Sequence, residues 1–361
     1  MEVDYDMEMK AREKPLISVT ISTYNSGATI EEVLNSLLIQ DYPLKLIEVI
    51  VVDDHSVDNT TDKVRKFMER YHDKFYDFKL VIHERNLGVS KARNDGIKLA
   101  RGEYIMILDS DVVLPPNAIS KMVSFMESNP SVGCCHLLLK TDSMDIISRW
   151  LWDVNIGKIR RIVCCTAAAM IRREVTEKAG LFDEAMGPPF SVDEDLEFAA
   201  RIWRAGYQCI MLGDITARHL MIKRDIQLAK LKGEKDQHRL TLSTYGRWLV
   251  GYLKKKHAQS WYKFLKSLPL KLRIRYAFSS LFLPCLIISF FGSLLQLSPL
   301  MYIVTLTLLL AIFLDVLRDF ISSPRKIHKS IILASLACIN RSVRGIAAFC
   351  YAIRARNVFK H

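Results

Sequence analysis

The sequence predicts an α/β fold with a Rossmann-like sheet, followed by a helical region that enters a membrane. From residue 16 onward, short runs rich in β-branched residues alternate with segments of helical period, which is typical of strands joined by crossover helices. Further on, the 39 residues from Tyr276 to Leu314 include no Asp, Glu, Lys or Arg. That length is close to the roughly 40 residues that two membrane-crossing helices need.

Six runs have the composition of strands. They span residues 16–22 (LISVTIS), 47–52 (IEVIVV), 78–83 (FKLVIH), 103–108 (EYIMIL), 132–139 (VGCCHLLL) and 162–171 (IVCCTAAAMI), with a less regular stretch at 143–161. Between the first two strands, apolar residues from Ile30 to Leu38 recur at helical spacing, and Thr29 with Glu32 has the spacing of a capping box. Residues 195–205 predict a second amphipathic helix, with Leu196, Ala199, Ile202 and Trp203 on one face.

The charge distribution favours a membrane surface over a nucleic acid as the partner of this chain. Residues 221–275 hold 15 Lys and Arg against 3 Asp and Glu, an excess that equals the net charge of +12 of the whole chain. This basic run directly precedes the apolar stretch, as expected for anchoring on an anionic cytoplasmic leaflet. The break at 296–299 (QLSP) predicts a helical hairpin, and the basic residues after it place both ends on the cytoplasmic side.

The remaining segments complete the expected organisation. The first residues have no apolar h-region, so we expect no signal peptide and a cytoplasmic first domain in a multi-pass protein of the cell membrane. Asn340, Arg341 and Arg344 interrupt the apolar pattern of 328–356, which favours an interfacial helix over a third span. The expected division is a tail (1–15), a catalytic domain (16–220), a basic juxtamembrane segment (221–275), two membrane helices (276–320), and a basic loop with an interfacial helix (321–361).

The eight cysteines indicate buried thiols in a reducing compartment. They include the adjacent pairs Cys134-Cys135 and Cys164-Cys165 and no C-x-x-C motif. Neighbouring positions on a strand face opposite ways, so an adjacent pair suits neither a zinc site nor a disulfide framework.

Two acidic pairs follow predicted strands. Asp53 and Asp54 end the second strand, where a carboxylate can accept a base N–H or a ribose hydroxyl, although Asp-Asp-x-Ser suits a turn and helix cap equally well. Asp109 and Asp111 follow a strongly apolar strand, and two carboxylates at i and i+2 can share one hard cation that bridges diphosphate oxygens. The alternative for this second pair is a solvated Asp-x-Asp turn.

A third acidic cluster, Asp193-Glu194-Asp195, begins the helix at 195–205. The helix dipole favours carboxylates at that end, so stabilisation of the helix N-terminus explains the cluster as well as a catalytic role does. An attacking hydroxyl, however, needs a positioned base, and clustered carboxylates raise one another's pKa values. This segment alone leaves both interpretations open.

The order of the three clusters, on a framework whose first strand ends in Ser-Thr-Tyr-Asn, resembles glycosyltransferase family 2. The resemblance covers roughly residues 16–220 and rests on the segments ISVTISTYN (17–25), VVDDHSVDNT (51–60), NLGVSKARNDGI (86–97), ARGEYIMILDSDVVLPP (100–116), AAAMIRREVTEKAGLFDE (167–184) and DEDLEFAARIWRAGY (193–207). Members of this family are inverting enzymes with the GT-A fold. The resemblance therefore implies transfer of a sugar from a nucleotide donor, UDP more than GDP, with Mn²⁺ or Mg²⁺ as cofactor.

Carried over position by position, the resemblance assigns five residues to the donor. It implies that Thr23, Tyr24 and Asp54 hold the nucleobase end of the nucleotide sugar, with Asp53 in support. It places Arg93 near the ribose or the diphosphate.

The resemblance assigns five residues to the metal and the reaction. Asp109 and Asp111 would form the D-x-D pair, with Asp109 also facing the nucleotide and Asp111 as the direct metal ligand. His219 matches a late histidine that some relatives add to the metal shell, although a lone histidine near a strand end is more often structural. Asp195 occupies the position of the general base, with Glu194 beside it.

The region near residue 237 departs from the pattern of processive synthases. Those enzymes have Q-x-x-R-W, whereas Gln237-His238-Arg239-Leu240 is followed by no tryptophan until Trp248. We therefore expect single addition to a lipid-linked or glycolipid acceptor, with no nucleic-acid partner.

A sugar-1-phosphate nucleotidyltransferase would open with a Gly-rich phosphate loop, which is absent from the sequence. A catalytically inactive membrane-bound nucleotide-sugar-binding or scaffold protein is the main alternative, although all three acidic clusters are present.

Overall fold

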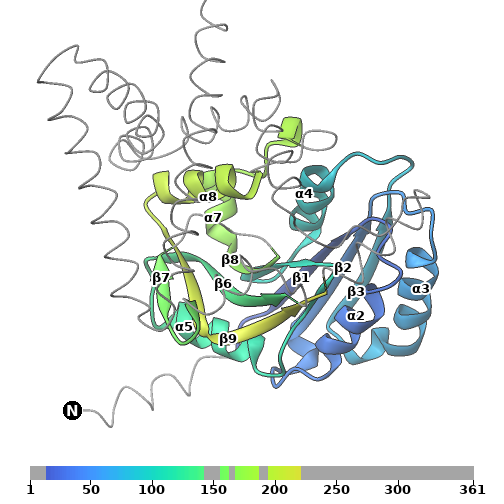
Figure 1. The fold of residues 1–361 in the computed structure, drawn as a ribbon, viewed down its shortest axis with the longest axis horizontal. Helices are drawn as coiled ribbons and strands as arrows, with labels where there is room; N and C mark the ends of the chain where they lie inside the picture. The colour runs from blue at the N-terminus through green and yellow to red at the C-terminus, as the bar shows by residue number, and fades with distance from the viewer. Residues whose placement is uncertain (1–13, 142–154, 162–166, 187–193, 221–361) are drawn as a thin grey trace, which may run out of the picture.

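The computed structural model describes residues 14–141, 155–161, 167–186 and 194–220. These residues form one mixed β-sheet with helices on both faces (Figure 1). The predicted segments 221–275, 276–320 and 321–361, most of the N-terminal tail, and Cys164-Cys165 lie outside the described residues. Within the described ranges, no helix is both long and apolar enough to cross a membrane.

The N-terminal half of the sheet is parallel, as the alternation of strands and helices predicts. Its strands are β1 (Ile17–Thr23), β2 (Ile47–Asp53), β3 (Asp77–Ile82) and β4 (Tyr104–Asp109), in the spatial order β3-β2-β1-β4. All seven residues of β2 are buried. A parallel strand covered on both faces is expected to be apolar throughout, which explains the IEVIVV run.

The second half of the sheet is mixed. It contains β5 (Val112–Val113), β6 (Val132–Thr141), β7 (Ile159–Arg161), β8 (Ala168–Arg172) and β9 (Gln208–His219). β8 is antiparallel to both β4 and β6, β9 is parallel to β6, and β5 and β7 are antiparallel to β9. β8 confirms the C-terminal part of the strand predicted at 162–171, whose first five residues lie outside the described ranges. β9 was not predicted as a strand.

The two faces of the sheet bury separate apolar clusters. α2 (Ile30–Leu38), α3 (Thr60–Tyr71) and α5 (Ala118–Glu127) cover one face, and α4 (Val89–Leu99), α7 (Arg173–Ala179) and α8 (Glu194–Arg204) cover the other (Figure 1). Three short 3-10 turns lie at Leu44–Leu46, His72–Lys74 and Glu184–Met186. The thiols of Cys134 and Cys135 are buried in opposite clusters, which confirms the burial predicted for this adjacent pair.

The capping box predicted at Thr29 is wrong. Thr29 is the N-cap residue of α2, but its side chain makes no capping hydrogen bond. Its hydroxyl instead donates to the carbonyl oxygen of Ser110, 81 residues away, at 2.8 Å. A tertiary partner therefore replaces the local one, and the start of α2 is tied to the turn between Asp109 and Asp111.

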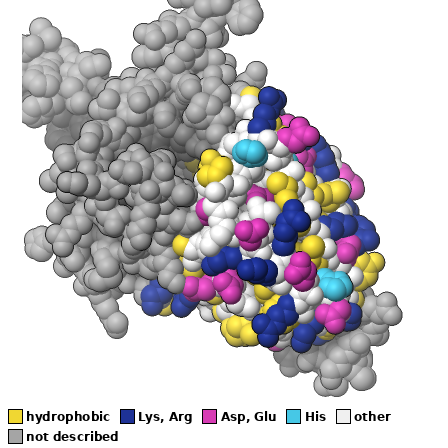
Figure 2. All heavy atoms as spheres, turned by 90° about the vertical axis from the view of Figure 1, so that its right-hand side faces the viewer, with side chains coloured by type: hydrophobic (Ala, Val, Ile, Leu, Met, Phe, Trp, Pro, Cys, Tyr) yellow, Lys and Arg dark blue, Asp and Glu magenta, His cyan; other side chains and the backbone are white. Residues whose placement is uncertain are grey.

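The outer face over α2 and α3 has a mixed charge. Figure 2 shows Lys and Arg interspersed with Asp and Glu across this side of the molecule. Ion pairs join some of these groups, for example Lys63 with Glu31 at 3.3 Å between α3 and α2. Exposed pairs of this kind contribute at most about 1 kcal/mol, so the fold depends mainly on the two buried clusters.

Candidate active site

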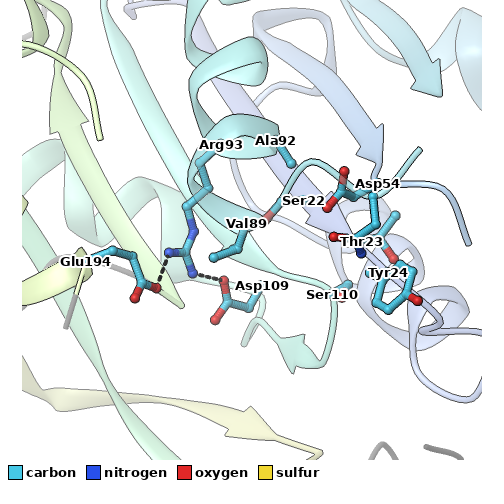
Figure 3. Close-up of a pocket in the computed structure, with 11 residues that line it drawn as sticks. Ser22, Thr23, Tyr24, Asp54, Val89, Ala92, Arg93, Asp109, Ser110 and Glu194 are labelled. Carbon is cyan, nitrogen blue, oxygen red and sulfur yellow. Dashed lines mark hydrogen bonds and ion pairs between the residues drawn. The ribbon is translucent and has the colours of Figure 1, made fainter. Parts of the chain in front are cut away.

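A cavity of about 300 Å³ opens at the carboxyl ends of β1, β2 and β4. In an open α/β sheet this is where ligands bind, because the loops that leave the strands meet there. Six of the predicted site residues line the cavity (Figure 3): Thr23, Tyr24, Asp54, Arg93, Asp109 and Glu194. Five residues that the sequence did not single out as site residues complete the wall: Ser22, Asn86, Val89, Ala92 and Ser110.

Asp54 organises the loop that leads into α4. Its Oδ1 accepts hydrogen bonds from the backbone N–H of Leu87 at 2.7 Å and from His83 Nδ1 at 2.8 Å, and its Oδ2 accepts one from the N–H of Gly88 at 2.7 Å. Gly88 has φ of +98°, a conformation that a side chain would strain. A carboxylate offers about four acceptor positions. Among the described residues three donors reach Asp54, which leaves about one position for a ligand.

Asp53, its neighbour, is fully buried and does not line the cavity. It accepts hydrogen bonds from the N–H of Ser56 at 3.0 Å, from the Ser56 hydroxyl at 2.5 Å and from the Thr61 hydroxyl. These contacts fix the turn between β2 and α3. The turn-and-cap interpretation of the Asp-Asp pair therefore describes Asp53, and the ligand-facing interpretation describes Asp54.

Thr23 and Tyr24 form the wall beside Asp54 (Figure 3). The backbone N–H of Asp54 donates to the carbonyl of Thr23 at 2.8 Å, which joins the ends of β1 and β2. The Thr23 hydroxyl is buried and has no hydrogen-bond partner among the described residues. Tyr24 is 40% exposed at the cavity, so its ring can cover a planar ligand.

Arg93 crosses the cavity between two carboxylates (Figure 3). Its guanidinium donates to Asp109 Oδ1 at 3.1 Å and to Glu194 Oε1 at 2.9 Å, and it lies 5.4 Å from the ring centre of Phe182. Burial disfavours the charged guanidinium, but the charges of Asp109 and Glu194 outweigh it and raise the pKa of Arg93 above its usual value. Arg93 therefore remains a cation that joins β4 to α8.

Glu194 is the first residue of α8 and is mostly buried. Burial raises the pKa of Glu194, Arg93 lowers it and the charge of Asp195 raises it, and the net result is a pKa above the usual range. A carboxyl group of this kind can exchange a proton nearer neutral pH than an exposed glutamate. Asp195 follows it on α8, and its Oδ1 accepts from the N–H of Leu196 at 2.8 Å. Asp195 is not among the residues that line the cavity, and Asp193 lies outside the described residues.

The turn from Asp109 to Asp111 is held by neighbouring loops. The Ser110 hydroxyl lies 2.8 Å from the Ser26 hydroxyl, and the Ser110 carbonyl accepts from Thr29. Asp111 Oδ1 lies 3.4 Å from His219 Nε2, and the Asp111 carbonyl accepts from the N–H of Leu220 at 2.8 Å. The sequence placed Asp111 and His219 in one site, and the fold brings them together through the pairing of β5 with β9.

The donor set of this turn fits a hard divalent cation. Two carboxylates and an imidazole suit Mn²⁺ or Mg²⁺, and Mg²⁺ is commonly bound by one or two carboxylates together with substrate phosphates. Within the described ranges, no group of three or more His, Cys, Asp and Glu side chains is arranged as a metal site. Asp109 is engaged by Arg93, so Asp111 and His219 are the adjacent pair that diphosphate oxygens would complete.

Family profiles match most of this architecture. The profile described as "Glycosyl transferase family 2" matches residues 18–180, and the one described as "Glycosyl transferase family group 2" matches residues 104–315, which is more than half of the chain. The chain belongs to glycosyltransferase family 2. The GT-A-like fold expected from the sequence is confirmed for the described residues.

Individual relatives match over shorter stretches. The poly-beta-1,6-N-acetyl-D-glucosamine synthase of Staphylococcus epidermidis is 38% identical over 117 residues, which is 32% of this chain and 27% of that protein. The poly(ribitol-phosphate) beta-glucosyltransferase of Bacillus spizizenii is 36% identical over 118 residues, 32% of this chain and 18% of that protein. The match thus spans about a quarter or less of either relative.

The fold resembles that of a solved glycosyltransferase structure. Residues 1–349 of S. aureus TarS, crystallised in complex with UDP, superpose with a TM-score of 0.50 and 20% sequence identity. The superposition covers 70% of this chain and 81% of that one. At this level of identity the likeness establishes the fold of the described domain.

Proposed function

We propose that this glycosyltransferase transfers a sugar from a UDP-linked donor to a membrane-associated, lipid-linked acceptor, with inversion at the anomeric carbon. The observation that supports the donor is the arrangement of Asp54. Its roughly one remaining acceptor position matches the single N3–H of uracil. Guanine presents two adjacent N–H groups that call for both oxygens of a carboxylate, and three protein donors already occupy most of those positions.

The rest of the nucleotide sugar follows from the walls of the cavity. Tyr24 covers the base, and the buried Thr23 hydroxyl provides a further polar contact. Arg93 faces the diphosphate side, together with Asp109. Asp111 and His219, with Asp109 at the other end of the same turn, would hold Mn²⁺ or Mg²⁺, and the bound cation would neutralise the diphosphate charge.

The reaction is a single displacement. Asp195 takes the proton of the acceptor hydroxyl, and the oxygen attacks the anomeric carbon as the bond to the diphosphate breaks. Glu194 is tied to Arg93, so it stabilises the start of α8 beside the base. Because the acceptor oxygen attacks from the side opposite the leaving diphosphate, the configuration at the anomeric carbon is inverted. A retained configuration in the product, measured by NMR, would contradict this mechanism.

Nucleotide binding tests the donor assignment. We expect UDP to bind more tightly than GDP and CDP in isothermal titration with Mn²⁺, because cytosine has no N3–H and guanine requires two acceptors. Replacing Asp54 by Asn should reduce the preference for UDP over CDP. The matched control is Asp41→Asn, because Asp41 is an exposed carboxylate whose contact is the Ser120 hydroxyl at 2.8 Å. GDP binding equal to or tighter than UDP binding would rule out the proposed donor.

Transfer assays test the acceptor and the membrane assignment. Radiolabelled sugar from UDP donors should enter a membrane lipid extract, and EDTA should stop the transfer. We expect truncation near Arg275 to preserve nucleotide binding and to weaken transfer to membrane acceptors. The truncated chain should float with anionic liposomes at low salt and dissociate at high salt, since attraction by basic residues is screened. Salt-resistant flotation would show that the basic segment itself inserts.

A further inference from the structure

His83 occupies a position behind the cavity that neither the proposed mechanism nor the family assignment uses. It follows the last residue of β3 and is 8% exposed. Its Nδ1 lies 2.8 Å from Asp54 Oδ1, and its Nε2 lies 3.2 Å from Asp95 Oδ2 on α4. One buried imidazole thus joins the carboxylate that lines the cavity to a second carboxylate outside it.

The two contacts define the protonation state of the ring. A neutral imidazole carries one N–H, and an ionised carboxylate only accepts hydrogen bonds, so a neutral ring satisfies one of the two contacts and opposes the other. Burial raises the pKa of Asp95, but hydrogen bonds from Lys91 and His83 and the charges of Lys91 and Lys98 lower it below its usual value. Asp95 is therefore ionised, and the arrangement requires an imidazolium that donates to both carboxylates.

The imidazolium fixes the orientation of the Asp54 carboxylate at the cavity. The N–H groups of Leu87 and Gly88 come from a loop, whereas His83 and Asp95 are fixed by β3 and α4. The positive ring also offsets the charge of Asp54 beside a cavity that must admit a diphosphate. Loss of the second proton removes one of the two contacts and leaves the carboxylates of Asp54 and Asp95 without a cation between them.

We infer that His83 is a positioning residue for the donor nucleoside: as an imidazolium bridging Asp54 and Asp95, it holds the Asp54 carboxylate with one acceptor position toward the base. This inference rests on the proposed UDP donor. Besides Asp54 and Asp95, the ionisable groups near His83 are Lys91 and Lys98, which contact Asp95, and His55, whose Nδ1 lies 3.3 Å from the backbone carbonyl of His83.

Two substitutions separate the two ring contacts. The amide of His83→Asn can replace Nδ1 and keep the contact with Asp54, whereas the amide of His83→Gln reaches toward the Nε2 position and Asp95. We expect His83→Gln to weaken UDP binding by roughly tenfold, as for loss of a hydrogen bond to a charged group. His83→Asn should weaken it less, because its amide can keep the contact with Asp54. The matched control is His72→Gln, because His72 is exposed at the end of α3.

The measurements use the full chain in detergent micelles. Titration with UDP and Mn²⁺ across a pH series gives the affinities, and the donor KM should rise in His83→Gln with kcat changed little. Thermal unfolding identifies a variant that has lost its fold, in which case Asp95→Asn, at the far end of the bridge, supplies the same comparison. UDP affinity in His83→Gln equal to that of the parent at every pH would overturn the inference.

A measurement made without ligand tests the role of His83 separately from the assignment of UDP as the donor nucleotide. Nitrogen-15 NMR of the histidine rings should show both nitrogens of His83 protonated at the pH where binding is tightest. A ring with one unprotonated nitrogen at that pH would refute the positioning role, even if UDP binds. A parent chain that shows the doubly protonated ring but fails to bind UDP would instead refute the donor assignment.

Discussion

Arg93→Met should destabilise the domain strongly, because it removes a buried cation from between two carboxylates. The side chain of Arg93 is 6% exposed, and those of Glu194 and Asp109 are 13% and 24% exposed. Removal of one partner from a buried ion pair costs about 3–5 kcal/mol, since the remaining charge is left unpaired. Methionine fills much of the same volume, so the loss of charge dominates over cavity formation.

The effect can be measured as a shift in the midpoint of thermal unfolding. A cost of about 3–5 kcal/mol corresponds to a fall of about 6–20 °C for a domain of this size. The control is Arg218→Met, which removes an arginine from an ion pair with Glu32 at 3.0 Å, where the two side chains are 62% and 38% exposed. We expect a much smaller shift there, because solvent screens the exposed guanidinium.

The pH dependence checks the cause of the destabilisation. Arg93 lowers the pKa of Glu194, so its removal raises a pKa that already lies above the usual range. A carboxyl group with a raised pKa in the folded state destabilises the fold above that pKa, and this penalty disappears as pH falls below the pKa of the unfolded state. The difference between Arg93→Met and the parent should therefore shrink on acidification. A difference that is constant with pH, or a shift no larger than that of Arg218→Met, would refute the electrostatic account.

Three further outcomes are expected. Asp111→Asn should abolish transfer and make nucleotide binding insensitive to Mn²⁺ without lowering the unfolding midpoint; near-normal turnover would contradict the metal assignment. Asp195→Asn should keep UDP binding and lose transfer by about 10²- to 10⁴-fold, as expected for a general base, whereas loss of UDP binding would indicate a structural role. Gly102→Ala should destabilise the fold by about 1–3 kcal/mol, because a Cβ there would lie 2.6 Å from the backbone of Leu16 and of Ser18. An unchanged unfolding midpoint would contradict this prediction and show that the backbone moves to accommodate the methyl group.

The parallel half of the sheet could be predicted because its strands have a local signature. β2 and β4 are mainly apolar and β1 alternates Ile and Val with Ser and Thr; all three strands are buried almost throughout, and polar residues follow each of them at the cavity. β9 lacks such a signature. Its pairing with β6 jumps from Leu212 to Thr216, so three residues, Gly213 to Ile215, interrupt the alternation that would have identified a strand. β5 has two residues, too few for any periodicity.

The individual site residues were easier to predict than their contacts. Local pattern identified Asp109 and Glu194, and the family resemblance identified Arg93. Arg93 and Glu194 are 101 residues apart, so their hydrogen bond depends on where the fold places the start of α8 relative to α4. Nothing in the sequence near Thr29 indicates that its hydroxyl bonds to Ser110 rather than capping α2. His83 follows a strand end as Asp54 does, and the same reasoning about strand ends could have found it.

The hydrogen bond from Leu220 to Asp111 places the chain's exit from the described domain beside the D-x-D turn. An extended chain advances at most about 3.3–3.6 Å per residue, so a segment ten residues beyond Leu220 lies within about 36 Å of Asp111. Any surface that this segment binds therefore lies within that distance of the D-x-D turn. Insertion of a flexible linker after residue 220 would increase the maximum distance in known steps. The dependence of transfer rate on linker length would then show how closely acceptor binding and sugar transfer are coupled.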